Sequence, residues 1–417
     1  MPGEVVLQCQ VGKEHMPVTG GNQVAYVLIE AKPTALLASV RMPLNFALVL
    51  DHSGSMKGAK LQKVKEAVKM LVDQLAPTDY VSVIVFDDTA QVIVPAQPAI
   101  DKMSIKALVD RVRDGGGTTM SLGMNLGLQE LRRHMGPGTV SRMILLTDGV
   151  TYGDTNRCRQ LADEALSQGI NIYPLGIGAD WDEDFLDNIG QRSGGTPAEF
   201  IQSPNDALSV FSQQFQSASA VVVRNAVLTV RLPVGIAPRK AIKVFPLITD
   251  VSQSALGDRQ IVVPLGDLER DTPQSVLVEL LVDPKPAGIF RIAQAELSYD
   301  VPSTGITGER VRADVIVEFT TDPAQAATVN PIVMNFAEKA NAHRLVTRVL
   351  DEYKQTGRVT TRLSPNVTRV LDQETQAALD ALSTGQASQE EAKTIVKSIG
   401  NKTRKLTQRL DDQEFNL

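Results

Sequence analysis

Cysteine and aromatic residues are scarce in this chain of 417 residues, and long apolar runs are missing from it. Its two cysteines, Cys9 and Cys158, lie far apart and outside any C-x-x-C pair. This usage predicts two reduced thiols in a cytoplasmic protein, because disulfides are rare in that compartment. A disulfide between the two is the alternative that the sequence leaves open. Since aromatics make up only 4% of the residues, we expect cores built from valine, leucine, isoleucine and alanine.

Charge and hydropathy argue against two classes of partner. The formal net charge of −6 is small for this length and gives no sign of the basic patch that nucleic-acid binding usually requires. No uncharged apolar run reaches about 18 residues, so we expect no membrane-spanning helix. The N-terminus also lacks the basic and then apolar pattern of a secretory signal, which favours a cytoplasmic location.

The pattern along the chain divides it into four segments. A chain of this length exceeds the usual limit for one hydrophobic core, so more than one domain is expected. Residues 1–43 contain strands that we expect to join a later β-sandwich, and residues 44–217 form an α/β domain inserted between them. Residues 218–322 alternate apolar and polar positions between turn signals, which predicts the antiparallel β-sandwich. Residues 323–417 predict a C-terminal helical region. Its helices are expected over 330–355, 372–383 and 389–409.

The α/β segment alternates apolar strands with amphipathic helices. In the helix expected over 60–75, Leu61, Val64 and Leu71 lie on one stripe. Repeated strand–helix units predict a Rossmann-like, doubly wound and mostly parallel sheet with helices on both faces. The run at 90–94 follows the preceding strand after only a few residues, which predicts one antiparallel edge strand. The strands are expected at 44–50, 80–86, 90–94, 141–147, 171–177 and 198–201.

Two acidic residues follow strands that such a sheet brings together. Asp51 directly follows the first apolar strand of the segment, and Asp148 directly follows the fourth. Ser53 and Ser55 come after Asp51, in a turn that leads into a helix. If the strand order is 3-2-1-4-5-6, the first and fourth strands are neighbours where the order reverses, and ligands bind there beyond the strand ends. We therefore expect the two aspartates to face each other across a crevice.

A glycine-rich loop adds a further hydroxyl. Three glycines at 115–117 precede Thr118, and they let the backbone come close to a ligand. Thr118 directly follows the glycines and is the preferred ligand, with Thr119 as the alternative. Two carboxylates and three hydroxyls are hard oxygen donors, which suit Mg²⁺, Mn²⁺ or Ca²⁺ rather than zinc. Such a site leaves one position on the ion for water or for the carboxylate of a partner protein.

Together the three elements resemble the von Willebrand factor A family, also called integrin I-like, and its bacterial members in particular. The metal-ion-dependent adhesion site of that family has the pattern D-x-S-x-S, then a threonine in a G-G-T element, then an aspartate in a T-D-G element. The resemblance covers about residues 44–216. It implies a non-enzymatic adhesion or scaffold module that binds an acidic group of a protein partner through a Mg²⁺-type ion. The implied metal ligands are Asp51, Ser53, Ser55, Thr118 and Asp148.

Two other functions stay open. In the first, the chain is a scaffold that binds its partner through the sandwich or the helical tail, and the metal site has a regulatory role. A metal-dependent phosphatase is the weaker alternative. Two carboxylates on one ion can activate water, but no second metal cluster, catalytic histidine or phosphate-binding lysine accompanies the site in the sequence.

Five further residues near these motifs have simpler interpretations than a role at the metal. We expect His52 to point away from the ion, because alternate positions supply the ligands. Asp154 is expected to cap the helix that follows it, with an outer role at the metal site as the alternative. Asp87 and Asp88 are expected to form a solvated turn, and Trp181 is expected to pack inside the protein.

Overall fold

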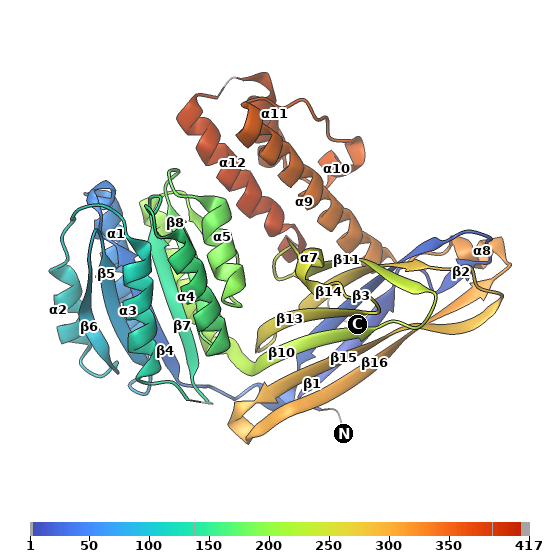
Figure 1. Cartoon of the computed structure of the whole chain (residues 1–417), viewed down its shortest axis with the longest axis horizontal. Coiled ribbons are helices and arrows are strands. Elements are labelled where there is room, and N and C mark those ends of the chain that lie inside the picture. The colour runs from blue at the N-terminus through green and yellow to red at the C-terminus, as the bar shows by residue number, and fades with distance from the viewer. Residues whose placement is uncertain (1–2, 137, 386, 410–417) are drawn as a thin grey trace. The chain divides into compact units, whose positions relative to one another are not determined.

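The computed structural model describes residues 3–136, 138–385 and 387–409 (Figure 1). Residues 1–2 and 410–417, which belong to the first and last predicted segments, lie outside the described residues. The chain divides into two compact units, which we call the α/β unit and the two-sheet unit. Both cysteines are free thiols, as predicted.

A six-stranded sheet lies at the centre of the α/β unit, which comprises Val40–Val221 and Gln389–Ser398. Its strands are β4 (Leu44–Asp51), β5 (Tyr80–Phe86), β6 (Ala90–Pro98), β7 (Val140–Thr147), β8 (Asn171–Ile177) and β9 (Glu199–Ile201). They lie in the order β6-β5-β4-β7-β8-β9, and every pair is parallel except β5 with β6. The doubly wound sheet and its antiparallel edge strand are therefore confirmed, and β4 and β7 are central neighbours.

Helices cover both faces of this sheet (Figure 1). They are α1 (Ala59–Gln74), α2 (Lys102–Asp110), α3 (Met120–Arg132), α4 (Thr155–Ser167), α5 (Glu183–Arg192) and α6 (Ala207–Ala220). Successive residues of a strand point to opposite faces. Accordingly, Leu48 of β4 packs in a core with α1, α2 and α6, and Val49 packs in a second core with α3, α4 and α5. The sequence pattern does not predict α2, because Ile105 and Val109 are its only buried residues and make too short a stripe.

Two mainly antiparallel sheets form the other unit, which comprises Met1–Ser39, Val222–Ser388 and Ile399–Leu417. Their strands are β1 (Val5–Val11), β2 (His15–Pro17), β3 (Gln23–Pro33), β10 (Val221–Arg231), β11 (Ile236–Phe245), β12 (Thr249–Asp250), β13 (Gln260–Glu269), β14 (Gln274–Val282), β15 (Gly288–Val301) and β16 (Ile306–Thr320). One sheet has the order β1-β3-β14-β11-β12, and the other has the order β13-β10-β15-β16-β2. Contacts between the sheets join β1 to β16 and β11 to β13, as in a sandwich.

Irregular strands account for the differences from the predicted sandwich. β10 joins two segments, 221–223 and 226–232, that the sequence pattern separates. A bulge after Arg224 interrupts its pairing with β15, and Asn225 has a φ of 55° there. Such a bulge breaks the two-residue alternation on which the prediction depends. β11 is not predicted at all, because Pro238 and the two basic residues after it interrupt the alternation, and a second bulge follows this proline.

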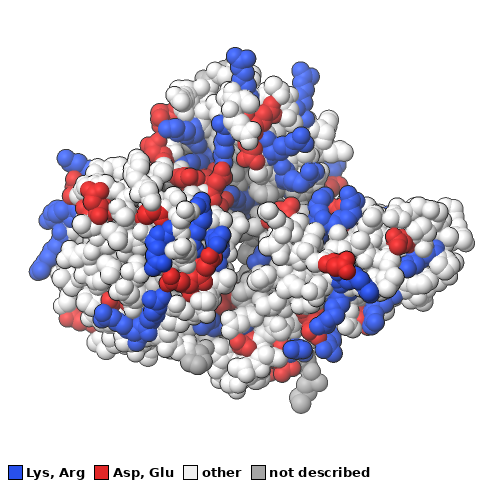
Figure 2. Space-filling view, in the orientation of Figure 1, with Lys and Arg blue, Asp and Glu red and all other residues white. Residues whose placement is uncertain are grey.

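The C-terminal region is helical, as predicted. α9 and α11 each end at a glycine with positive φ, Gly357 and Gly385, a conformation that favours glycine. No helix in the described ranges is long and apolar enough to span a membrane. Basic and acidic side chains are interspersed on the face shown in Figure 2. The remaining helices are α7 (Ser252–Ala255), α8 (Pro323–Ala327), α9 (Pro331–Thr356), α10 (Pro365–Arg369), α11 (Gln373–Thr384) and α12 (Gln389–Arg404).

Candidate metal centre

Two buried carboxylates lie at the adjacent ends of β4 and β7. Asp51 is the last residue of β4, and Asp148 directly follows β7; they are 0% and 1% exposed. The parallel register pairs Leu50 with Leu146, so the two strands end at the same edge of the sheet. Burial raises the pKa of the Asp51 carboxyl, hydrogen bonds to it lower that pKa, and the charge of Asp148 raises it further. A cation shared by the two carboxylates would offset both the burial and the repulsion.

Hydrogen bonds connect these carboxylates through the two serines. The Ser53 N–H donates to Asp51 Oδ1 at 2.8 Å. The hydroxyl oxygens of Ser53 and Ser55 lie 3.1 Å apart, and the Ser55 hydroxyl donates to Asp148 Oδ1 at 2.6 Å. The Thr147 hydroxyl donates to the other Asp51 oxygen at 2.6 Å. The structure therefore brings four of the five predicted ligands into one hydrogen-bonded cluster.

The main chain of Thr118 is tied to the loop that follows Asp148. Its carbonyl accepts hydrogen bonds from the Tyr152 N–H and the Thr151 hydroxyl, both at 3.3 Å. Two residues earlier, the carbonyl of Gly116 accepts a hydrogen bond from the Gly54 N–H at 3.0 Å. The glycine-rich loop is thus tied both to the serine turn and to the loop after Asp148. Thr118 itself is 7% exposed.

Asp87 and Asp88 hold the glycine-rich loop, a role that the sequence interpretation missed. Asp87 Oδ2 accepts a hydrogen bond from the Gly116 N–H at 3.1 Å, and Asp88 Oδ2 accepts one from the Gly117 N–H at 2.9 Å. A Cβ on Gly116 would lie 2.2 Å from Asp88 Oδ2. The absence of side chains on the glycines leaves room for the two carboxylates. The predicted turn is present and Asp88 is exposed, but the two aspartates also bind the loop. The sequence feature that could have indicated this role is the pair of acidic residues directly after β5, the strand next to β4.

His52 faces this loop and not the serines. Its Nδ1 lies 2.7 Å from the carbonyl oxygen of Arg113, and its Nε2 lies 3.8 Å from Asp87 Oδ2. Its main chain also holds the loop, because its carbonyl accepts a hydrogen bond from the Gly115 N–H at 2.7 Å. His52 therefore helps to fix the glycine-rich loop, and its orientation away from an ion stays a prediction.

Asp154 caps a different helix from the one predicted. It stands at the N-cap position of α4, but its side chain makes no capping hydrogen bond there. One carboxylate oxygen accepts a hydrogen bond from the Ser121 N–H in the first turn of α3 at 2.7 Å, and the other accepts one from the Thr151 hydroxyl at 2.5 Å. Asp154 therefore occupies the predicted N-cap position, but its carboxylate binds the start of α3 instead of the first turn of α4. Asp154 fixes the loop after Asp148 to the start of α3, just beyond Thr118.

Lys60 is the other residue that the sequence interpretation missed. It lies in the first turn of α1, and its Nζ is 2.5 Å from Asp148 Oδ2. The sequence interpretation considered only a phosphate-binding lysine and did not predict this ion pair with Asp148. The position of Lys60 five residues after Ser55, at the start of the helix that follows the serine turn, was the available signal. Asp148 thus has a hydroxyl on one oxygen and an ammonium group on the other.

Trp181 packs inside the α/β unit, as predicted. It is 3% exposed, and its Nε1 donates a hydrogen bond to the Gly178 carbonyl at 2.8 Å. A Cβ on Gly176 would lie 2.0 Å from the indole ring. This tryptophan supports the end of β8 and is not a surface anchor.

The donor set fits a hard divalent cation. Two carboxylates and three hydroxyls offer only oxygen, which Mg²⁺, Mn²⁺ and Ca²⁺ prefer. The described residues contain no group of three or more histidine, cysteine, aspartate or glutamate side chains that could hold an ion. The candidate centre therefore depends on its hydroxyls, and with only two negative charges it leaves the ion able to attract an anionic ligand.

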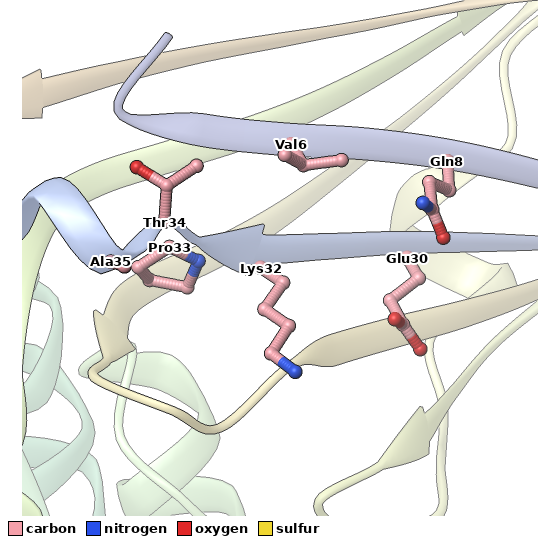
Figure 3. Close-up of a pocket in the computed structure, with 7 residues that line it drawn as sticks. All are labelled: Val6, Gln8, Glu30, Lys32, Pro33, Thr34 and Ala35. Atoms are coloured by element: carbon pink, nitrogen blue, oxygen red, sulfur yellow. The ribbon is translucent and has the colours of Figure 1, made fainter. Parts of the chain in front are cut away.

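A separate pocket of about 260 Å³ lies on β1 and β3 of the two-sheet unit (Figure 3). Glu30 and Lys32 extend their side chains into this region from the same strand. Burial raises the pKa of Glu30, and a hydrogen bond from the Ser275 hydroxyl opposes this. All lining residues belong to this unit, so the pocket is not part of the metal centre. They are Val6, Gln8, Glu30, Lys32, Pro33, Thr34 and Ala35.

The α/β unit has the fold of a von Willebrand factor type A domain. The family model with that description matches residues 45–214. Domains of this type are commonly metal-dependent protein-interaction modules, and they typically bind a divalent metal.

Two relatives show how far the similarity extends along the chain. The chain is 35% identical over 278 residues to an uncharacterized protein of Synechocystis sp., an alignment that covers 64% of each chain. It is 32% identical over 181 residues to inter-alpha-trypsin inhibitor heavy chain H4 of Homo sapiens, which covers 40% of this chain and 19% of the relative. The chain therefore spans less than two thirds of the length of either relative.

Two solved structures share the fold over nearly the whole chain. A von Willebrand factor type A protein from Catenulispora acidiphila matches with a TM-score of 0.76 at 17% identity, over 96% of both chains. The ArnB paralog VWA2 from Sulfolobus acidocaldarius matches with a TM-score of 0.57 at 14% identity, over 97% of this chain and 99% of that one. The likeness thus includes the two-sheet unit as well as the α/β unit.

Proposed function

We propose that this chain is a metal-dependent protein-binding module of the adhesion or scaffold type. In this proposal the α/β unit holds a Mg²⁺-type ion and recognises an acidic side chain of a partner protein through it. The observation that carries the proposal is the cluster in which two buried carboxylates and two serine hydroxyls meet at the ends of β4 and β7. The proposed ligands are Asp51, Ser53, Ser55, Thr118 and Asp148.

The chemistry of this donor set favours an acidic partner. Three of the five ligands are neutral hydroxyls, so two carboxylates only balance the charge of a divalent ion. The ion, when bound, would supply a Lewis-acidic position for one more oxygen ligand. The chain's own residues hold the loops around that position through Asp87, Asp88 and Asp154.

An apolar rim beside the cluster supports binding of a protein. Val150 and Tyr152 follow Asp148 in the same loop and are 41% and 77% exposed. Exposed aromatic residues contribute strongly to many protein interfaces. We therefore propose a partner segment in which an acidic side chain has an apolar neighbour that contacts this loop.

Two substitutions test the metal centre. Asp51→Asn removes one charge but keeps the size of a buried side chain, and Ser55→Ala removes an exposed hydroxyl. Each should weaken Mn²⁺ binding at least about tenfold in calorimetric titration, because each removes or neutralises a ligand. Ser167→Ala, at an exposed serine of α4, is the matched control and should bind Mn²⁺ like the wild type.

Partner capture tests the function itself. Pull-down from a lysate with Mg²⁺ and with EDTA, followed by mass spectrometry, should yield a partner that is captured only with Mg²⁺ and not by Asp51→Asn. Capture that persists in EDTA would contradict the proposal. It would favour the alternative in which the sandwich binds the partner, for which the pocket on β1 and β3 is the specific feature. Turnover of a phosphate ester that depends on Asp148 would instead favour the phosphatase alternative.

A further inference from the structure

Lys60 and Asp148 form an ion pair of unequal exposure. The Nζ of Lys60 lies 2.5 Å from Asp148 Oδ2, and the two side chains are 30% and 0% exposed. The ammonium group reaches from the half-exposed start of α1 to a fully buried carboxylate. A buried carboxylate requires a compensating charge, and here Lys60 supplies it.

The two oxygens of Asp148 have different partners. Oδ1 accepts a hydrogen bond from Ser55 and so faces the proposed metal ligands, while Oδ2 faces Lys60. A divalent ion held by this cluster would therefore bind Asp148, and the ammonium group of Lys60 already neutralises the charge of that carboxylate. Two cations on one carboxylate repel each other, so each weakens the binding of the other.

We propose that Lys60 is a tethered counter-cation that competes with the divalent ion for Asp148 and thereby sets the metal affinity of the site. This inference rests on the proposed function, because it assumes that the cluster binds a divalent ion. Lys60 is a positioning residue in this scheme and not a metal ligand. Its role is to keep the buried carboxylate neutralised when metal is scarce.

The surroundings of Lys60 allow it to release Asp148. Its side chain passes Gly178, where a Cβ would lie 3.7 Å from both Cε and Nζ of the lysine. Asp180, two residues further along the same loop, pairs with Lys393 at 3.0 Å, and its charge also interacts with that of Lys60. A lysine stem is flexible and its ammonium group is readily hydrated. When a divalent ion binds the Asp148 carboxylate, the Lys60 side chain can therefore turn toward solvent and Asp180.

Removal of the ammonium group should strengthen metal binding. Lys60→Met keeps the length of the side chain and removes the competing charge, so Mn²⁺ should bind about tenfold more tightly, in the range that neighbours of metal ligands commonly control. Lys60→Arg keeps the charge and should stay close to the wild type. Lys63→Met is the matched control, because Lys63 lies on the same helix but pairs with the half-buried Glu66 and not with Asp148.

The experiment compares the full chain and these three variants by calorimetric titration with Mn²⁺ and by thermal unfolding in EDTA and in excess MgCl₂. In EDTA, Lys60→Met should unfold at a lower temperature than the wild type, since Asp148 is then buried without a counter-charge. In MgCl₂ the difference should disappear. A variant that folds only with Mg²⁺ would also support the proposal.

Equal or weaker Mn²⁺ binding by Lys60→Met would overturn the inference, and so would a variant that fails to fold even with Mg²⁺. A site loaded with its ion no longer needs the amine, so such a failure would mean that Lys60 has a purely structural role. If the wild type itself binds no Mn²⁺, the proposed function fails as a whole. That outcome differs from failure of the inference alone, in which the wild type binds Mn²⁺ and the Lys60→Met variant binds it no more tightly.

Discussion

At the scale of single residues, the three glycines at 115–117 are explained by the carboxylates beside them. The loop backbone lies so close to Asp87 and Asp88 that a Cβ at Gly115 or Gly117 would come within 2.4 Å of a carboxylate oxygen. The carboxylates in turn accept hydrogen bonds from the loop N–H groups. The glycines thus position the loop that carries Thr118 through Asp87 and Asp88.

Gly116→Ala should weaken the metal centre by displacing this loop. Its Cβ would lie 2.2 Å from Asp88 Oδ2, so the aspartate must move and its hydrogen bond to the Gly117 N–H is lost. We expect a loss of about 1 kcal/mol in unfolding free energy, the usual value of one hydrogen bond, and Mn²⁺ binding weaker by about tenfold. Thermal unfolding and Mn²⁺ titration measure the two effects.

Gly149→Ala is the control for this change. Gly149 directly follows Asp148, but a Cβ there meets nothing within 4 Å. The variant should keep the wild-type stability and Mn²⁺ affinity. If both glycine variants lose the same Mn²⁺ affinity, any substitution near the ion is harmful. The hydrogen bonds of the loop to Asp87 and Asp88 would then not explain why the loop contains glycines.

Tyr152→Ser should separate partner binding from metal binding. The ring is 77% exposed, whereas the residue holds Thr118 only through its backbone N–H, which serine retains. We expect partner capture to weaken by about 2 kcal/mol, the size typical of an aromatic hot spot, with unchanged Mn²⁺ affinity. Leu166→Ser, at a residue of α4 that is 53% exposed, should affect neither. A Tyr152 variant that captures the partner normally would remove the apolar rim from the proposed interface.

At the scale of secondary-structure elements, the sequence predicts strands best where every residue of the strand is buried. β4 and β7 are buried along their whole length, so their apolar runs define both strands and place Asp51 and Asp148 at their ends. Lys60 and Asp154 could not be assigned in this way. Their partners depend on how separate loops meet in three dimensions, and no periodic pattern records this.

Helix α9 makes the two-sheet unit sensitive to acid through His343. Its Nδ1 lies 3.0 Å from the Thr403 hydroxyl oxygen. The pKa of His343 is lowered to about 4, chiefly by burial and also by the charge of Arg404, while the charge of Asp250 opposes both. The unfolded chain therefore binds a proton on this ring below pH 6.5, the ordinary pKa, while the folded chain stays neutral until about pH 4. Stability is lost as the pH falls through this window.

His343→Gln should flatten this pH dependence. We expect the wild type to lose about 2 kcal/mol of unfolding free energy between about pH 7 and about pH 5 from this group alone, and the variant to lose correspondingly less. Urea unfolding at the two pH values, monitored by circular dichroism, measures the difference. Parallel losses in the two proteins would show that the ring is not held neutral by the fold.

At the scale of the whole molecule, the α/β unit is an insertion into a sheet. β3 precedes it and β14 follows it, and the two strands pair from Gln23 to Ala31. The sequence predicts that the N-terminal strands join the later sandwich, because these strands have no partner nearby in the chain. The cytoplasmic location inferred from the cysteines stays a prediction, and so does the identity of the partner.

Because the proposed metal ligands all belong to one unit, metal should stabilise that unit alone. Trp181, the only tryptophan of the chain, is buried in the α/β unit, so its fluorescence reports the unfolding of that unit, whereas circular dichroism reports both. Mg²⁺ at about 100 times its Kd should add about 2.7 kcal/mol to the stability of the α/β unit. The fluorescence transition should therefore move to higher temperature with Mg²⁺, and circular dichroism should retain a component that does not move. Asp51→Asn should abolish the shift. If all of the circular dichroism signal moves together with the fluorescence, the two units unfold as one, and metal binding stabilises the entire chain.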